Sequence, residues 1–288
     1  MISIIISSYL PLYFSALERN IADTIGVPYE IIKIDNPGIM GICEAYNNGA
    51  EKAKYDYLLF IHEDILFQTS EWGLKLISHL NVSGTGVIGL AGSSYVPVAP
   101  SSWTVSEEYN FINILQGNKN NTESFLIKKV PQNMNPVYAV DGVFLGIKKE
   151  NFINYKFNSD IKGFHGYDLD FTLRVSKKLQ NYVVDDILVQ HFSMGNLEKK
   201  WLDANIRIRS QLGSDFQKRI DHKTEEKIFS GFLYKYFEYY PITIKSLLFT
   251  LKFYPYKYFN YKQHCFFIKK YFNYIRYKSQ INKKLKTN

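Results

Sequence analysis

The stretch EAYNNGAEKAKYDYLLFIHED, residues 44–64, joins a helix to a strand. Its first half, together with Ile42, places apolar and small residues at helical spacing. Its second half contains YLLFI (57–61), an unbroken apolar run that predicts a strand buried on both faces. The polar residues HED (62–64) follow directly. The stretch therefore predicts one helix–strand unit that ends on three polar side chains.

Two more predicted strands precede this unit. ISIIISSY (2–9) and YEIIKID (29–35) are short runs rich in β-branched residues, and residues 14–25 between them have helical spacing. The order strand, helix, strand, helix, strand predicts an α/β fold with a mostly parallel central sheet flanked by helices. Ligands of such sheets bind beyond the carboxyl ends of the strands. Those ends carry Ser7-Ser8-Tyr9, Asp35-Asn36 and His62-Glu63-Asp64.

The second half of the pattern is less regular. It predicts a helix at 71–80 and strands at 87–94, 138–149 and 182–192. A further helix is expected to begin at Asp168. The segment 95–137 is rich in Pro, Asn, Ser and Gly and contains Trp103. Because a loop of that length in a compact domain is usually functional or disordered, we expect a loop or lid there.

Composition limits the class of protein. Of the 288 residues, 46% are hydrophobic and 22% charged, so the chain can bury a sizeable core. Cys43 and Cys265 are too few for a disulfide framework, and no His/Cys cluster has the spacing of a zinc site. The apolar run at the N-terminus is too short for a signal peptide, and no stretch approaches the roughly 20 apolar residues of a membrane span. We expect neither export by a signal peptide nor a membrane-spanning segment.

The last 50 residues differ chemically from the rest. Residues 239–288 contain 11 Lys and Arg and no Asp or Glu, whereas residues 1–238 contain 24 basic and 27 acidic residues. Fifteen of the 50 are Phe or Tyr. Three interpretations remain open: a helical pair packed on the rest of the protein, an interfacial membrane anchor, or a nucleic-acid-binding segment. The membrane surface is favoured, and because no nucleic-acid module is recognisable, no nucleic-acid partner is expected.

Several polar residues have both a structural and a functional interpretation. His62 and Asp64 either lie in a solvated loop or point to one side and bind a divalent cation that also takes diphosphate oxygens. Asp168 precedes an apolar helical run and is either a helix N-cap or a catalytic carboxylate. His191 at a strand end is either structural or a metal ligand. Trp103 either packs in its loop or stacks on a sugar.

These segments, in order, resemble the motifs of GT-A fold, family 2-like glycosyltransferases over about residues 2–196. ISIIISSY resembles the opening strand VSVIIPTYN, after which residues hold the nucleotide base. IIKIDN resembles a strand ending in VDD, which implies that Asp35 contacts the uracil or ribose. EAYNNGAEKAKYDYLLFIHED resembles AARNxGxxxAxGEYILFLDxD, which aligns Asn47 and Gly49 with the Asn and Gly of that pattern and Asp64 with the last Asp of DxD.

The resemblance continues on the acceptor side. GFHGYDLDFTLRV and then VVDDILVQHF resemble GxxxEDxDLxLR followed by a strand that ends in His. This implies that Asp168 is the catalytic base and His191 a late metal ligand. Three positions depart from the pattern: His62 replaces the first DxD aspartate, Tyr167 the acidic residue before the base, and Tyr46 the usual Arg. Because imidazole is softer than carboxylate, His62 favours Mn²⁺ over Mg²⁺.

Together, the residues and the resemblance imply a candidate site. Asp168 is the expected base, with Asp170 as the alternative, in an inverting single displacement. The expected contacts are Ser7, Tyr9, Asp35, Asn47, Glu63 and Asp64 for the nucleotide sugar; His62, Asp64 and His191 for a divalent cation, Mn²⁺ or Mg²⁺; and Trp103, Asp141, Tyr167 and Asp170 for the acceptor.

The expected organisation is a catalytic domain over 1–222 and a basic, aromatic helical extension over 223–288. Within the catalytic domain, 1–94 is the nucleotide-sugar half and 138–222 the acceptor-side half. The expected function is transfer from a nucleotide-sugar donor, a UDP-sugar first, to a saccharide or lipid-linked acceptor in bacterial surface polysaccharide assembly, in the cytoplasm or on the inner face of the membrane. The alternatives are a degenerate nucleotide-sugar or glycan-binding protein and a structural membrane-surface adaptor.

Overall fold

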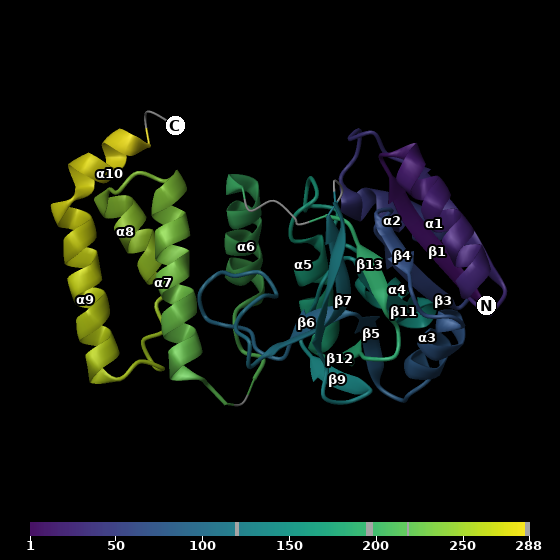
Figure 1. Cartoon of the computed structure of the whole chain (residues 1–288). Helices are drawn as coiled ribbons and strands as arrows, with labels where there is room; N and C mark the ends of the chain where they lie inside the picture. Colours follow the sequence, from purple (N-terminus) through teal and green to yellow (C-terminus); the bar gives the residue numbers. More distant parts are fainter. Residues whose placement is uncertain (119–120, 194–197, 218, 286–288) are drawn as a thin grey trace. The chain divides into compact units, whose positions relative to one another are not determined.

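The computed structural model describes residues 1–118, 121–193, 198–217 and 219–285 (Figure 1). The chain divides into two compact units. The first comprises Met1–Tyr95 and Glu107–Asn196, and the second comprises Val96–Ser106 and Leu197–Asn288. The boundary expected at residue 222 therefore falls inside the second unit.

The first unit is built on a seven-stranded sheet in the order β2-β1-β3-β11-β5-β12-β9. Its strands are β1 (Ile2–Ser8), β2 (Tyr29–Asp35), β3 (Tyr57–Ile61), β5 (Thr85–Gly89), β9 (Met134–Val137), β11 (Phe144–Lys148) and β12 (Gln180–Val184). β1 runs parallel to β2 and β3, and β12 parallel to β5, whereas β11 and β9 are antiparallel to their neighbours. Five strands share one direction, which confirms the mostly parallel α/β sheet.

The helices of this unit are α1 (Pro11–Thr24), α2 (Ile42–Lys52), α3 (Trp72–Leu80), α4 (Lys149–Tyr155) and α5 (Tyr167–Ser176). The strand β1 is paired on both sides, with β2 and β3, and its residues Ile4, Ile5 and Ile6 are fully buried. α2 approaches β1 closely at Gly49, where a Cβ atom would lie 2.3 Å from the Ile5 side chain. This close packing explains the glycine and fixes α2 against β1.

A second, six-stranded sheet positions part of the site. It has the order β10-β6-β7-β13-β4, with β8 paired to β7. Its strands are β4 (Ile65–Phe67), β6 (Ala91–Ser93), β7 (Asn110–Asn118), β8 (Asn121–Lys129), β10 (Ala139–Val140) and β13 (Val189–His191). β13 is antiparallel to β4, with His191 opposite Ile65. This pairing brings the end of β13 beside the turn that follows β3.

Three segments predicted as single strands are each divided between the two sheets. The segments 87–94, 138–149 and 182–192 become β5 and β6, β10 and β11, and β12 and β13, respectively. A continuous apolar run predicts burial of both parts but does not show that the chain changes sheets between them.

The loop expected over 95–137 is wrong for most of its length, because β7, β8 and β9 lie there. Two of the asparagines that suggested a loop, Asn113 and Asn135, are buried and hydrogen-bonded inside the sheets. Asn113 donates to the Ile187 carbonyl at 2.8 Å, and Asn135 donates to the Val183 carbonyl at 3.1 Å. Each is 1% exposed. Paired polar side chains can be buried in this way at little cost.

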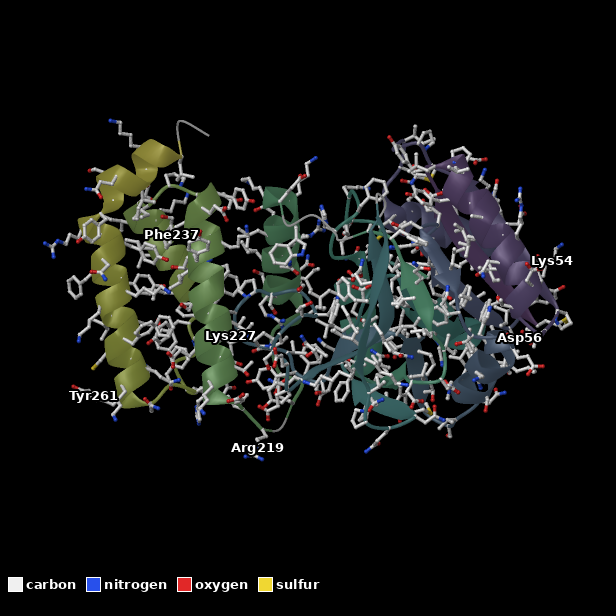
Figure 2. The ribbon with its side chains drawn as sticks, viewed as in Figure 1. Lys54, Asp56, Arg219, Lys227, Phe237 and Tyr261 are labelled. Carbon is white, nitrogen blue, oxygen red and sulfur yellow. The ribbon has the colours of Figure 1, made fainter. Side chains whose placement is uncertain are left out.

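The second unit is helical and has an aromatic core. Its helices are α6 (Lys199–Leu212), α7 (His222–Tyr239), α8 (Ile244–Leu251), α9 (Tyr261–Arg276) and α10 (Lys278–Lys284). Rings meet between α7 and α9, where Phe229 lies 5.0 Å from Phe267 and Phe237 lies 4.6 Å from Tyr274. Figure 2 labels Phe237 on α7. None of the helices formed by the described residues combines the length and the apolar character that crossing a membrane requires.

Candidate functional site

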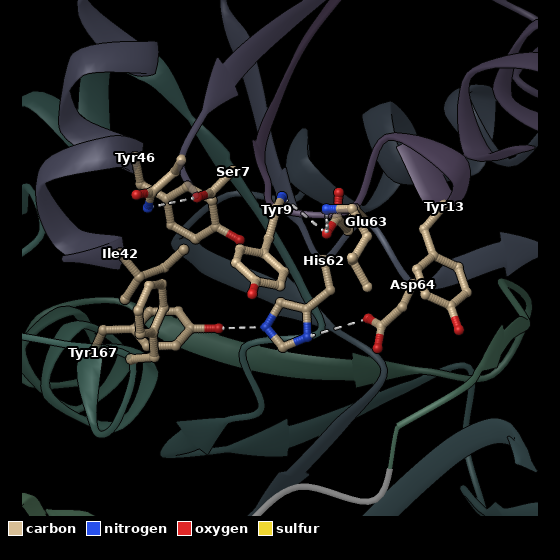
Figure 3. A pocket seen from close by; sticks show the side chains of 12 residues that line it. Ser7, Tyr9, Tyr13, Ile42, Tyr46, His62, Glu63, Asp64 and Tyr167 are labelled. Atoms are coloured by element: carbon tan, nitrogen blue, oxygen red, sulfur yellow. Dashed lines mark hydrogen bonds and ion pairs between the residues drawn. The ribbon is translucent and has the colours of Figure 1, made fainter. Parts of the chain in front are cut away.

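A pocket of about 260 Å³ opens beside the carboxyl ends of β1 and β3 (Figure 3). It is lined by Ser7, Tyr9, Leu10, Tyr13, Asn36, Ile42, Tyr46, His62, Glu63, Asp64, Phe164 and Tyr167. These residues come from the β1–α1 junction, the end of β2, α2, the turn after β3, and the start of α5 with the residues before it. The structure thus brings together segments that the sequence placed at separate strand ends.

Glu63 holds the junction between β1 and α1. One carboxylate oxygen accepts the backbone N–H groups of Tyr9 at 2.9 Å and Leu10 at 2.7 Å, and the other accepts the Ser8 hydroxyl at 2.8 Å. These bonds hold Tyr9 at the pocket, with 63% of the residue exposed. Glu63, expected to contact the nucleotide sugar, therefore positions the junction that lines the pocket.

Glu63→Ala is expected to lower the free energy of unfolding by about 2 kcal/mol, since hydrogen bonds to a charged group contribute about 1.5–3 kcal/mol each and water recovers part of that at an exposed junction. Urea denaturation measures the change. Glu18→Ala, an exposed carboxylate on α1 in the same unit, is the control and should change stability by less than about 0.5 kcal/mol. Equal effects of the two variants would contradict the positioning role.

The end of β2 contributes Asn36 to the pocket. Its buried amide donates to the Ser7 hydroxyl and the Met40 carbonyl, both at 3.1 Å, and accepts the Met40 N–H. The donor contact was expected instead at the neighbouring Asp35, whose side chain is 78% exposed and paired with Lys33 at 2.7 Å. Asp35 does not line the pocket. The available signal for Asn36 was its place at a strand end, which its neighbour shared.

Asn47 has a structural role. Its side-chain amide donates to the Phe157 carbonyl at 2.9 Å and accepts the Phe157 N–H at 3.0 Å, and it also reaches the Ser159 hydroxyl. Both ends of the amide therefore fasten α2 to the segment after α4. The expected nucleotide-sugar contact by Asn47 is not supported, because its polar atoms are used and it does not line the pocket.

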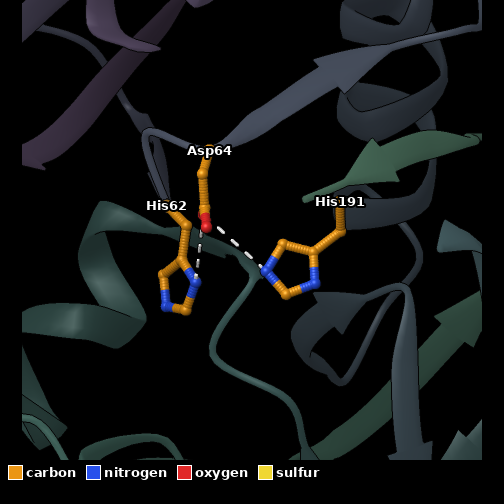
Figure 4. A group of neighbouring side chains, drawn as sticks. All are labelled: His62, Asp64 and His191. Carbon is orange, nitrogen blue, oxygen red and sulfur yellow. Dashed lines mark ion pairs between the residues drawn. The ribbon is translucent and has the colours of Figure 1, made fainter. Parts of the chain in front are cut away.

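His62, Asp64 and His191 form a group whose possible ligand atoms all lie within 4.8 Å of one another (Figure 4). Nδ1 of His62 is 3.9 Å and Nε2 of His191 is 3.7 Å from the same Asp64 oxygen. Atoms bound to one ion at about 2.1 Å lie roughly 3 Å apart, so small side-chain rotations would close the group. Two imidazoles and a carboxylate suit a first-row divalent cation.

Two tyrosines lie behind His62. The Tyr167 hydroxyl is 2.7 Å from His62 Nε2, and the Tyr46 hydroxyl donates to the Ile61 carbonyl at 3.2 Å. Burial raises the pKa of both phenols, so both stay neutral. A Cβ atom on Gly142 would fall 1.9 Å from the Tyr167 oxygen, which explains the glycine there. Tyr167, expected toward the acceptor, thus forms the wall that orients His62.

Asp168 lies in the first turn of α5, whose N-cap is Gly166, so the N-cap interpretation of Asp168 is wrong. Its carboxylate accepts the Gly142 N–H at 3.2 Å. Burial and the nearby charge of Asp141 raise the pKa of Asp168 from 3.8 to about 7. Asp168 follows the lining residue Tyr167 and does not itself line the pocket. It is a carboxyl group poised to exchange a proton near neutral pH.

The other residues expected to contact the acceptor have different surroundings. Asp141 accepts the Val143 N–H at 2.9 Å beside Asp168. Asp170 is 1% exposed, and its carboxylate accepts an N–H of the Arg174 guanidinium at 2.8 Å, so the structure gives it a buried pairing role. Trp103 belongs to the second unit, whereas the pocket residues all belong to the first.

Comparison with known proteins gives one family match. The model of the Glycosyltransferase like family matches residues 11–229. No curated protein matches the sequence.

Two solved structures share the fold. One is GalNAc-T7 with UDP, GalNAc and Mn²⁺, at a TM-score of 0.53, 11% identity and coverage of 80% of this chain and 51% of that one. The other is residues 1–349 of TarS from S. aureus, at a TM-score of 0.50, 14% identity and coverage of 88% and 81%. The chain spans about half the length of the GalNAc-T7 structure. Identities this low indicate the GT-A fold and nothing more specific.

Proposed function

Because the chain belongs to the Glycosyltransferase like family and is a glycosyltransferase, we propose that it transfers a sugar from a UDP-sugar to a saccharide or lipid-linked saccharide acceptor. The observation that carries this proposal is the His62, Asp64 and His191 group beside a pocket at the strand ends. The GalNAc-T7 structure, of similar fold, contains UDP, GalNAc and Mn²⁺, which supports a uridine donor and a divalent cation here.

Asp64, His62 and His191 would hold the cation, with Mn²⁺ favoured by the two imidazoles. When bound, such an ion offsets the negative charge of a diphosphate leaving group. Tyr167 contacts the far nitrogen of His62, which leaves Nδ1 facing Asp64. Outer partners of this kind orient a ligand ring.

The donor would bind across the β1–α1 junction. The exposed Tyr9 ring offers a face for the base, and Ser7 and Asn36 offer polar atoms at the pocket wall. Glu63 keeps this junction in place. Pre-positioned groups of this kind reduce the entropic cost of binding and align the donor for attack.

Asp168 would take the proton of the acceptor hydroxyl as the hydroxyl attacks the anomeric carbon. The new bond to oxygen forms while the bond to the diphosphate breaks, so a single displacement inverts the configuration. A carboxylate with a pKa near the working pH is effective as a general base. The raised pKa of Asp168, about 7, supports this assignment.

The activity is expected to increase with pH, with a midpoint near 7, because the base must be deprotonated. Asp141→Asn should move that midpoint to lower pH, since it removes the charge that helps to raise the pKa of Asp168. Profiles of kcat/KM at saturating metal, for wild type and variant, measure both. A midpoint that stays unchanged in the variant would remove Asp168 as the titrating group.

The function itself is tested with a panel of UDP-, GDP- and CMP-sugars, each with Mn²⁺, Mg²⁺ or EDTA. We expect metal-dependent turnover of a UDP-sugar and loss of that turnover in EDTA. Binding of a UDP-sugar without turnover, in the presence of saccharide and lipid-linked acceptors, would favour the degenerate binding protein instead.

The extension over 223–288 is proposed to meet the membrane surface, so that the enzyme is peripheral on the inner face of a bacterial membrane. Its last 50 residues carry 11 basic and no acidic side chains. Lipid-linked acceptors of surface polysaccharide assembly would be within reach of an enzyme at that surface.

A further inference from the structure

Helix α9 has two apolar faces. The inner face packs within the second unit: Phe267 is fully buried 5.0 Å from Phe229 of α7, and the Tyr271 hydroxyl is 2.9 Å from the Thr250 hydroxyl of α8. In Figure 1, α7 and α8 lie on the same side of α9. One side of α9 thus packs against the aromatic core of the second unit.

The other face is a row of largely apolar residues, here called the outer stripe: Tyr261, Cys265, Ile268, Phe272 and Ile275, of which all but the partly buried Cys265 are exposed. Steps of four and three residues place all five on one side of an α-helix. Tyr261 is 82%, Ile268 55%, Phe272 66% and Ile275 53% exposed. Tyr261 projects from the start of α9 away from α7 (Figure 2). Single exposed apolar residues are ordinary, but a continuous row indicates an interaction surface.

A basic row borders the outer stripe. Lys262, Lys269 and Arg276 are spaced by seven residues, so they share one line along α9, and all three are exposed. α9 contains no acidic residue, and neither does the chain from residue 239 onward. The outer stripe is therefore apolar at its centre and positive along its border.

The apolar centre and basic border of the outer stripe favour an anionic lipid surface over a second copy of α9 as the partner. A second copy of α9 packed on the outer stripe would bring two basic rows together with no acidic side chain to pair with either, and like charges at such positions oppose association. An anionic bilayer instead takes apolar side chains below its headgroups and attracts lysine and arginine at its surface.

We propose that the outer stripe docks on an anionic lipid bilayer, with α9 lying along the membrane surface. This inference rests on the proposed membrane association of the extension and names the surface responsible. The competing surface in the same unit is α8, where Ile244 is 78% and Leu248 60% exposed. α8 has 8 residues against 16 in α9 and offers a shorter apolar row.

The test uses the full chain with vesicles of phosphatidylcholine, alone or with about 30% phosphatidylglycerol, in a flotation assay. The wild type should bind the anionic vesicles, and binding should fall in 0.5 M NaCl. The double variant Ile268→Ser/Phe272→Ser should bind at least about tenfold more weakly. The matched control Ile244→Ser/Leu248→Ser makes comparable changes on α8 and should bind within about twofold of wild type. Circular dichroism checks that both variants remain folded.

The outcomes separate the claims. Suppose that the wild type binds, and that either only the α8 variant binds more weakly or neither variant does. The membrane association then stands, and its assignment to the outer stripe is overturned. If the wild type binds neither vesicle, both fall, while sugar transfer is unaffected. If sizing shows a dimer that Ile268→Ser/Phe272→Ser dissociates, the partner is a second copy and the lipid assignment is overturned.

Discussion

Asp168→Asn is expected to lower kcat by about a thousandfold and to change the affinity for UDP by less than about threefold. The amide cannot accept the acceptor proton, but its oxygen can still accept the Gly142 N–H, so α5 keeps its place. Turnover with the preferred donor and calorimetric titration with UDP measure the two effects. Asp56→Asn, an exposed aspartate of the same unit, is the control and should be inert (Figure 2).

A stability measurement makes this prediction independent of the assay. The pKa of Asp168 is about 7 in the folded protein against 3.8 for an ordinary aspartate. Between those values the folded state keeps a proton that the unfolded state has lost, so wild-type stability falls as pH rises through that interval. Asp168→Asn lacks this fall and should melt several degrees above wild type at pH 8. An equal or lower melting temperature at pH 8 would contradict the burial of the charge.

Asp64→Ala is expected to weaken Mn²⁺ binding at least about a hundredfold and to abolish metal-dependent transfer. Asp64 supplies the one carboxylate of the group, and its oxygen is the atom that both histidines approach. Removing it leaves two imidazoles and no carboxylate in the group. Electron paramagnetic resonance of free Mn²⁺ measures the affinity without any assay of turnover.

The control for this variant is Asp35→Ala. Asp35 is the last residue of β2, and its side chain is 78% exposed, outside the pocket. It should leave Mn²⁺ affinity unchanged. Unaltered Mn²⁺ binding by Asp64→Ala would show that these three residues are not the metal site.

The strands that open the chain were predictable because their short runs of β-branched and other apolar residues favour a strand over a helix or a loop. β2 and β3 begin and end where the sequence predicts, at 29–35 and 57–61. YLLFI of β3 has no polar alternation and fits a strand covered on both faces, whereas β2 is an edge strand that was predicted from its β-branched residues. A local pattern is sufficient when both faces of an element have the same environment.

The second sheet was not predictable in the same way. β7 and β8 contain asparagines, and a sequence does not reveal that Asn113 will find the Ile187 carbonyl 74 residues further on. The same limit explains Asn36 and Glu63, whose roles depend on bonds to Ser7 and to Tyr9. Long-range hydrogen bonds decide these positions, and they leave no periodic signal.

The candidate metal group was only partly predictable from local sequence pattern. His62 and Asp64 at the end of a buried strand were visible from local pattern, but His191 joined them only through resemblance. The structure brings the three together through the pairing of β13 with β4. Resemblance also aligned Asn47 and Asp35, but a matching residue type does not show that their polar atoms contact other parts of the chain, as they do here.

The pairing of β13 with β4 also affects the order of folding. His191 lies 127 residues after Asp64 and reaches it because β13 pairs with β4, which begins directly after Asp64. During synthesis, the chain up to β12 would carry His62 and Asp64 alone, a pair too sparse to retain a metal ion firmly. Contacts between distant parts of a chain form late, because loop closure has to precede them. Tight metal capture would therefore mark a first unit whose folding is complete.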